Sequence, residues 1–125
     1  MDGLLEQSLE AHSRQPDVAS GSGYYQAGGD QDFHFRIASG SCNRRLFRLL
    51  CEDMYNLLRV YRFRGSATPG RARRAYQEHQ EVLAALRRRD ADAAEESMRR
   101  HIRLSWLNTE ARLAADDQSL KDVAT

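Results

Sequence analysis

The chain has 125 residues, of which 19 are Lys or Arg and 18 are Asp or Glu, and its formal net charge is +1. This length predicts a single domain with its own hydrophobic core, and the balanced charge indicates neither a nucleic-acid surface nor an anionic-membrane surface. No apolar run approaches the roughly 20 residues of a membrane-spanning helix, and no signal-peptide pattern is present at the N-terminus. We therefore expect a cytoplasmic protein without membrane contact.

The N-terminal part of the chain predicts two helices separated by a loop. The first covers residues 2–14 and ends before Pro16, because the proline ring clashes with a continuing helix. Glycine and serine are frequent in residues 15–29, which favours a loop there. The second helix is predicted over residues 30–38.

The rest of the chain predicts three longer helices, each with one apolar face. Asn43 is suited to cap the first of them, and Asp90 or Asp92 begins the last. The three helices cover residues 44–62, 71–88 and about 92–115. Amphipathic helices joined by short turns pack as an antiparallel bundle, so the predicted fold class is all-α. We expect a single domain over residues 1–125, with an irregular or partly truncated segment at 1–27, a core bundle at 28–115 and a polar, fraying tail at 116–125.

Four polar side chains lie on helix faces that are otherwise apolar: Asp30, His34, His79 and His101. Asp30 and His34 are one helical turn apart and therefore share a face. A buried carboxylate needs a compensating partner. Three neutral imidazoles and one carboxylate are suitable ligands for a borderline divalent ion, with Zn²⁺ the first choice and Ni²⁺ or a similar ion the alternative. A hydrogen-bonded cluster without an ion is the other interpretation.

Enzyme motifs are missing around these residues. The sequence contains no Glu-x-x-His repeat of a di-iron bundle, no His-Glu-x-x-His motif and no glycine-rich phosphate loop. A metal-dependent hydrolase also needs a general base beside the metal, and Glu78 points about 100° away from His79 around the helix. We therefore predict no catalytic residues. The alternatives left open are a small metal-dependent helical-bundle enzyme and a metal-free structural dimerisation module.

Four segments together are similar to a known family: DQDFHFRIA at 30–38, SCNRRL at 41–46, EHQEVL at 78–83 and RDADAAEESMRRHI at 89–102. In order and spacing they resemble the FCD domain, the C-terminal effector-binding domain of FadR-type regulators in the GntR family of bacterial transcription factors. The resemblance extends over about residues 28–113. It implies an antiparallel helical bundle, usually dimeric, with a central cavity that binds a metal ion.

The resemblance also implies roles for particular residues. The ligand pattern of the family is an aspartate, a histidine four residues later and two further histidines, and it falls on the four polar residues above: Asp30, His34, His79 and His101. In relatives the open positions of the metal bind water or the carboxylate of a small organic acid. Arg59 and Arg62 are candidates to bind the other end of such an effector.

The expected function is therefore metal-dependent sensing of a small carboxylate effector, within a GntR-type transcriptional regulator and without enzymatic activity. FadR-type regulators carry an N-terminal winged helix-turn-helix, for which this chain has no room. We expect sequence-specific DNA binding only through such a domain, and we expect the sensing domain to form a homodimer.

Overall fold

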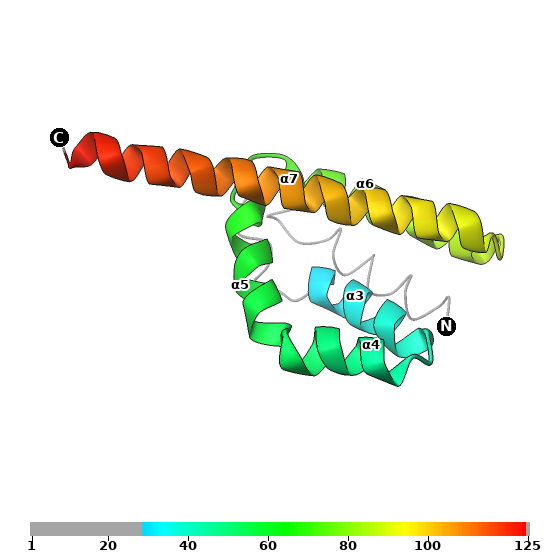
Figure 1. Ribbon diagram of the computed structural model, residues 1–125. Helices are drawn as coiled ribbons and strands as arrows, with labels where there is room; N and C mark the ends of the chain where they lie inside the picture. The colour runs from blue at the N-terminus through cyan, green and yellow to red at the C-terminus, as the bar shows by residue number, and fades with distance from the viewer. Residues whose placement is uncertain (1–28, 125) are drawn as a thin grey trace.

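The computed structural model of the protein describes residues 29–124, and it describes side chains from Phe33 onward. This part of the chain is built from helices, with no strand (Figure 1). The helices are α3 (Gly29–Gly40), α4 (Arg44–Arg48), the π-helix η2 (Leu49–Asp53), α5 (Tyr55–Ser66), α6 (Arg71–Arg87) and α7 (Ala91–Val123). The all-α fold class is confirmed. The helix predicted over residues 2–14 lies outside the described residues. No described helix has both the length and the apolar character that crossing a membrane requires.

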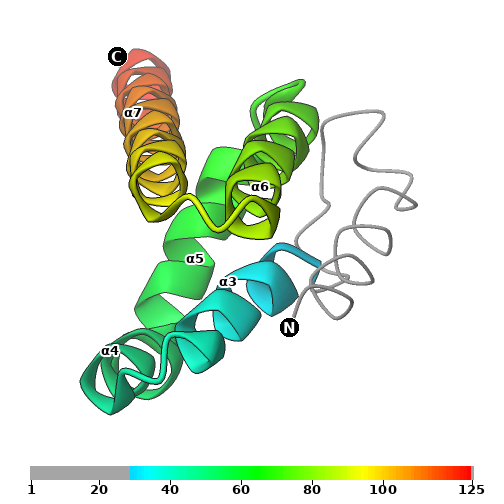
Figure 2. The same ribbon diagram turned by 90° about the vertical axis from the view of Figure 1, so that its right-hand side faces the viewer.

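The α6–α7 pair is the main packed unit of the domain. A tight turn joins the two helices, and Asp90 caps α7 by accepting a hydrogen bond from the Ala93 N–H at 3.0 Å. In Figures 1 and 2 the two helices lie side by side and antiparallel. Buried Val82 and Leu83 of α6 form the hydrophobic core together with Phe33 of α3. The core therefore joins α3 to the α6–α7 pair.

The remaining helices lie on one side of this pair. Figure 2 shows α6 and α7 on one side, α4 on the other, and α5 connecting the two sides. The last turn of α5 approaches α7 closely at Gly65, whose carbonyl accepts a hydrogen bond from Asn108 Nδ2 at 2.8 Å. A Cβ atom at Gly65 would lie 2.2 Å from Thr109 Oγ1. Any larger residue at position 65 would therefore force Thr109 or the two helices to move.

The single helix predicted over residues 44–62 is wrong. Asn43 does cap α4, since its Oδ1 accepts from the Leu46 N–H at 3.0 Å. The chain then forms a π turn, in which the Met54 N–H donates to the Leu49 carbonyl at 2.9 Å, five residues back. Met54 leaves helical geometry with φ −102° and ψ 5°, and α5 continues in a new direction (Figure 1). The apolar spacing continues through the break, so the sequence pattern does not reveal it.

The fifth predicted helix is longer than expected, because α7 continues to Val123 instead of ending near residue 115. Ion pairs and hydrogen bonds one turn apart stabilise the extension. Arg112 Nε lies 3.3 Å from Asp116 Oδ1, and Lys121 Nζ lies 2.6 Å from Asp117 Oδ2. The charged residues that led us to predict a fraying tail therefore pair with one another and stabilise the helix.

Candidate functional site

Three of the predicted metal ligands meet at one point between three helices. His34 comes from α3, His79 from α6 and His101 from α7. The Nε2 atoms of His79 and His101 are 3.2 Å apart, and those of His101 and His34 are 3.3 Å apart. One ring nitrogen from each histidine lies within 4.8 Å of the others, which is suitable for holding a metal ion. His79 and His101 are buried, and His34 is half-buried.

Asp30, the fourth predicted ligand, belongs to α3 and lies one turn before His34. Its side chain is outside the described residues. Ligation by Asp30 therefore stays a prediction.

The core of the domain fixes the position of the histidine rings. Phe33 is fully buried and stacks on the His79 ring, with 3.8 Å between ring centroids and 12° between ring planes. Because Phe33 and His34 are neighbours on α3, the same helix that covers His79 also delivers His34 to it. The packing that closes the core thus assembles the histidine cluster.

A buried ion pair supports His101 from the side opposite the other histidines. The two carboxylate oxygens of Glu78 accept hydrogen bonds from the guanidinium of Arg71 at 2.8 and 2.7 Å. Glu78 Oε2 also lies 2.5 Å from His101 Nδ1. All three side chains are buried. The result is a chain of charge-assisted contacts from Arg71 through Glu78 to His101.

The ionised Glu78 determines which nitrogen of His101 carries a proton. Burial raises the pKa of Glu78, but the hydrogen bonds from His101 and Arg71 and the charge of Arg71 outweigh it and lower the pKa to about 2. The carboxylate therefore accepts a hydrogen bond from Nδ1–H of His101, and in the neutral imidazole Nε2 keeps its lone pair. That nitrogen is the one that faces His34 and His79. A carboxylate bound to the second nitrogen of a ligand histidine is a recurrent support in metal sites.

Sequence reasoning missed this support because it judged Glu78 only against its neighbour His79. Glu78 does point away from His79 around α6, but it points toward α7 and His101. One signal was present in the sequence: Arg71 and Glu78 are seven residues apart, two turns along one helix face. The contact with His101 joins different helices, and no local pattern reports it.

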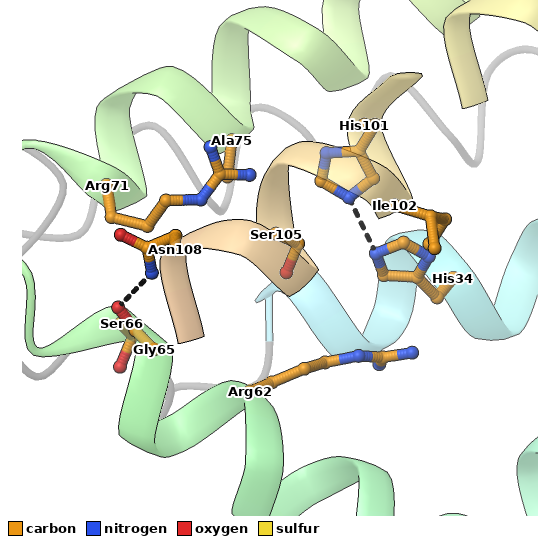
Figure 3. Close-up of a pocket in the computed structure, with 10 residues that line it drawn as sticks. All are labelled: His34, Arg62, Gly65, Ser66, Arg71, Ala75, His101, Ile102, Ser105 and Asn108. Carbon is orange, nitrogen blue, oxygen red and sulfur yellow. Dashed lines mark hydrogen bonds between the residues drawn. The ribbon is translucent and has the colours of Figure 1, made fainter. Parts of the chain in front are cut away.

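Two cavities adjoin the histidines. The smaller measures about 30 Å³, which is room for about one water molecule. Polar groups of His34, His101, Arg62 and Arg71 line it, and Figure 3 shows the Arg62 side chain extending from α5 toward His34. The larger cavity measures about 500 Å³ and is lined by side chains of α3, α4, η2, α5 and α7. His34, Arg62 and Ile102 line both cavities, so the two spaces meet beside the histidine cluster.

The structure places both predicted effector-binding arginines at the larger cavity. Arg59 and Arg62 line its wall from α5. No described residue that lines either cavity is acidic. Among the described lining residues, an anionic group entering beside His34 would therefore meet cationic or neutral side chains.

Comparison with known proteins agrees with this architecture. The chain matches the family model of the FCD domain over residues 3–104. No curated protein matches the chain closely enough to be called a relative. The family match covers most of the chain, including the whole predicted ligand set. The chain therefore belongs to the FCD domain family, the effector-binding domains of GntR-type regulators.

Proposed function

We propose that this domain senses a small organic acid in a metal-dependent manner and passes the signal to an attached DNA-binding domain of a GntR-type regulator. One observation carries the proposal. The Nε2 atoms of three histidines from three helices converge beside a cavity that contains two arginines. Membership of a family of effector-binding domains supports the sensing role.

The metal would be held by His34, His79 and His101, with Asp30 as the fourth ligand. The donor set fits such an ion, because imidazole nitrogens suit Zn²⁺, Ni²⁺ and similar ions and a carboxylate adds a compensating charge. Zn²⁺ is the ion we favour. When bound, it supplies positive charge that attracts a carboxylate. Glu78 holds His101 in the tautomer that ligation requires.

The acid would bind with its carboxylate near His34, where Arg62 can contribute a charge-assisted hydrogen bond. Arg59, one turn earlier on α5, lines the larger cavity, which Arg62 lines as well. A ligand at this point touches helices from both sides of the domain. It can shift their packing only by the difference between its affinities for the two arrangements.

The signal would act through the arrangement of two copies of the domain in a cytoplasmic homodimer. Several large apolar side chains on α5 and α7 are exposed in the single chain, which supports association: Leu57 (66%), Val60 (54%), Trp106 (52%) and Leu107 (46%). A change in helix packing on these faces would change the spacing of the attached DNA-binding domains.

A metal-free structural cluster is the second candidate. The distances between the histidine nitrogens, 3.2 and 3.3 Å, are also compatible with hydrogen bonds between imidazoles. In that case the histidines and the Arg71–Glu78 pair would form a closed polar network that only stabilises the fold.

Metal analysis of the purified chain separates the two candidates. We expect about one equivalent of bound divalent metal and a lower melting temperature after treatment with a chelator, because the ion binds only the folded site. Adding Zn²⁺ back should restore the melting temperature. A chain without stoichiometric metal, whose melting temperature the chelator does not change, would establish the metal-free cluster instead.

A further inference from the structure

We propose that the effector of this domain is a monocarboxylic acid with an extended apolar tail. The carboxylate lies between His34 and Arg62, and the tail fills the larger cavity. This inference rests on the proposed function and adds the chemical class of the ligand. We expect small hydroxy acids and di- and tricarboxylic acids to bind more weakly than such an acid.

The walls of the larger cavity are mainly apolar. Five of the helical elements contribute to them through the apolar side chains Phe35, Ile37, Leu46, Leu50, Leu58 and Met98. Some of this surface is in contact with water: Phe35 is 45% exposed and Leu46 is 38% exposed. Covering such surface with an apolar ligand is favourable in proportion to the area removed from water. The cavity therefore favours a ligand that is itself apolar over most of its length.

Positive charge is confined to one side of this apolar space. Arg59 and Arg62 are both on α5, three residues apart, so they project from neighbouring positions on one face. Arg62 also reaches the small cavity beside His34 (Figure 3). Besides His34, the other polar side chains that the described residues place at the cavity are those of Cys51 and Tyr55, which are uncharged in their usual states. A carboxylate beside α5 therefore has cationic partners, whereas the described lining residues of α3, α4, η2 and α7 offer a second carboxylate no Arg or Lys.

Size and desolvation exclude the smaller and more polar acids. A cavity of about 500 Å³ lies within the range of roughly 300–1,000 Å³ that holds drug-sized ligands. Acetate or lactate would leave most of it unfilled. Citrate would bring carboxylates and a hydroxyl against apolar walls, where an unpaired polar group is costly. An acid with one charged end and an apolar tail satisfies both parts of the site.

Calorimetric titration of the Zn²⁺-loaded chain with matched probes tests the inference. The probes are butanoate, hexanoate and octanoate, with octanamide as the uncharged counterpart and citrate as the polar one. We expect the Kd to fall about fourfold for each added methylene, which corresponds to about 0.8 kcal/mol per buried CH₂. Octanamide and citrate should each bind at least tenfold more weakly than octanoate.

Two variants test the binding of the carboxylate and of the apolar tail separately. Arg62→Gln should weaken octanoate binding about tenfold or more and leave the gain per methylene unchanged, because it removes a charge that faces the carboxylate and leaves the apolar walls as they are. Leu46→Gln should reduce the gain per methylene, and the partial exposure of Leu46 makes the change tolerable for folding. Arg73→Gln on the exposed face of α6 is the matched control and should change neither quantity.

The outcomes distinguish this inference from the function on which it rests. Tighter binding of citrate than of octanoate would overturn the ligand class and leave metal-dependent sensing intact. If the chain binds metal but none of the acids, the ligand class and the effector role both fail. If the chain binds no metal, metal dependence fails, and octanoate binding with the same methylene dependence would still support the ligand class.

Discussion

Helix α6 and the segment from α4 to α5 differ in how well their side chains are covered, while α7, which packs on α6, buries His101 and Thr109. α6 buries eight side chains, including the ionic Arg71 and Glu78 and the ligand candidate His79. α4 and η2 bury none, and α5 buries only Gly65 and Ser66 in its last turn. The histidine cluster is thus anchored mainly in the half formed by α6 and α7, which we call the packed half. Much of the wall of the larger cavity belongs to the half formed by α4, η2 and α5, which we call the sparsely packed half.

This difference suggests that one half of the domain holds the metal site and the other half moves in response to the ligand. A metal site needs ligands held in fixed positions, and the stacked Phe33 and the Arg71–Glu78 pair provide that on the packed side. A signal needs an element that can move at low energetic cost, and few buried contacts make such motion cheap. The π turn of η2 lies in that element, between α4 and α5. A ligand at the boundary is therefore expected to move α4 and α5 rather than α6 and α7.

Removal of a central ligand should have the largest effect. His79→Ala is expected to lower Zn²⁺ affinity by more than roughly a hundredfold, beyond the ~10–100-fold cost of changing an outer support. Competition with a chromophoric chelator measures this affinity, and circular dichroism checks that the variant still folds. His12→Ala changes the one histidine outside the predicted ligand set and serves as the control. Equal affinities of the two variants would count against ligation by His79.

Adding a side chain at Gly65, where the two halves touch, should have the second-largest effect. Gly65→Ala puts a Cβ 2.2 Å from Thr109 Oγ1, so either the Thr109 side chain must rotate or α5 and α7 must separate. We expect thermal or urea denaturation to show a loss of about 1–3 kcal/mol in the free energy of unfolding, typical of overpacking. Combining it with Thr109→Ala should recover part of the loss. If Gly65→Ala has no effect, the two halves are not held together at this position.

Removing the charge of Glu78, which supports His101, should have the next-largest effect. Glu78→Gln keeps the size of the side chain and its ability to accept hydrogen bonds but removes its charge. We expect Zn²⁺ affinity to fall ~10–100-fold. Glu95→Gln is the matched control, since Glu95 pairs with Arg99 at 2.6 Å on the exposed face of α7. Chelator competition on both variants provides the comparison, and an unchanged affinity in Glu78→Gln would remove Glu78 from the site.

The same variant makes a prediction for pH in the metal-free protein. The folded-state pKa of Glu78 is lowered from 4.5 to about 2, so its ionisation stabilises the fold above pH 4.5. This contribution is lost as the pH falls through the folded-state value near 2. Urea denaturation of wild type and Glu78→Gln should therefore give a stability difference that is constant above pH 4.5 and shrinks below it. A constant difference down to pH 2 would show that Glu78 is not held ionised.

The sequence predicted the parts of the molecule that local spacing controls. The helix over 71–88 and the Asn43 cap follow from periodicity and capping chemistry, and the structure has both. Three histidines on apolar faces predicted the cluster, because a polar ring inside a core needs partners. The break at Met54 was not predictable in this way, because an apolar pattern continues across a π turn. The Glu78–His101 contact was not predictable either, because it depends on how α6 and α7 pack against each other.

A change at the end of α7 should have the smallest effect. It tests whether the last turns of this helix belong to the packed half. Asp117→Asn removes the ion pair with Lys121, which is exposed and 2.6 Å long. Such pairs contribute about 0.3–0.5 kcal/mol to a helix, so amide hydrogen exchange near residues 118–123 should become slightly faster at low salt. Added salt should reduce the difference from wild type, because it screens exposed charges. Zn²⁺ and octanoate affinities should not change, because this turn contributes no side chain to either cavity. A change in either affinity would mean that the last turns of α7 are coupled to the site, and the division between a packed and a movable half would then have to include them.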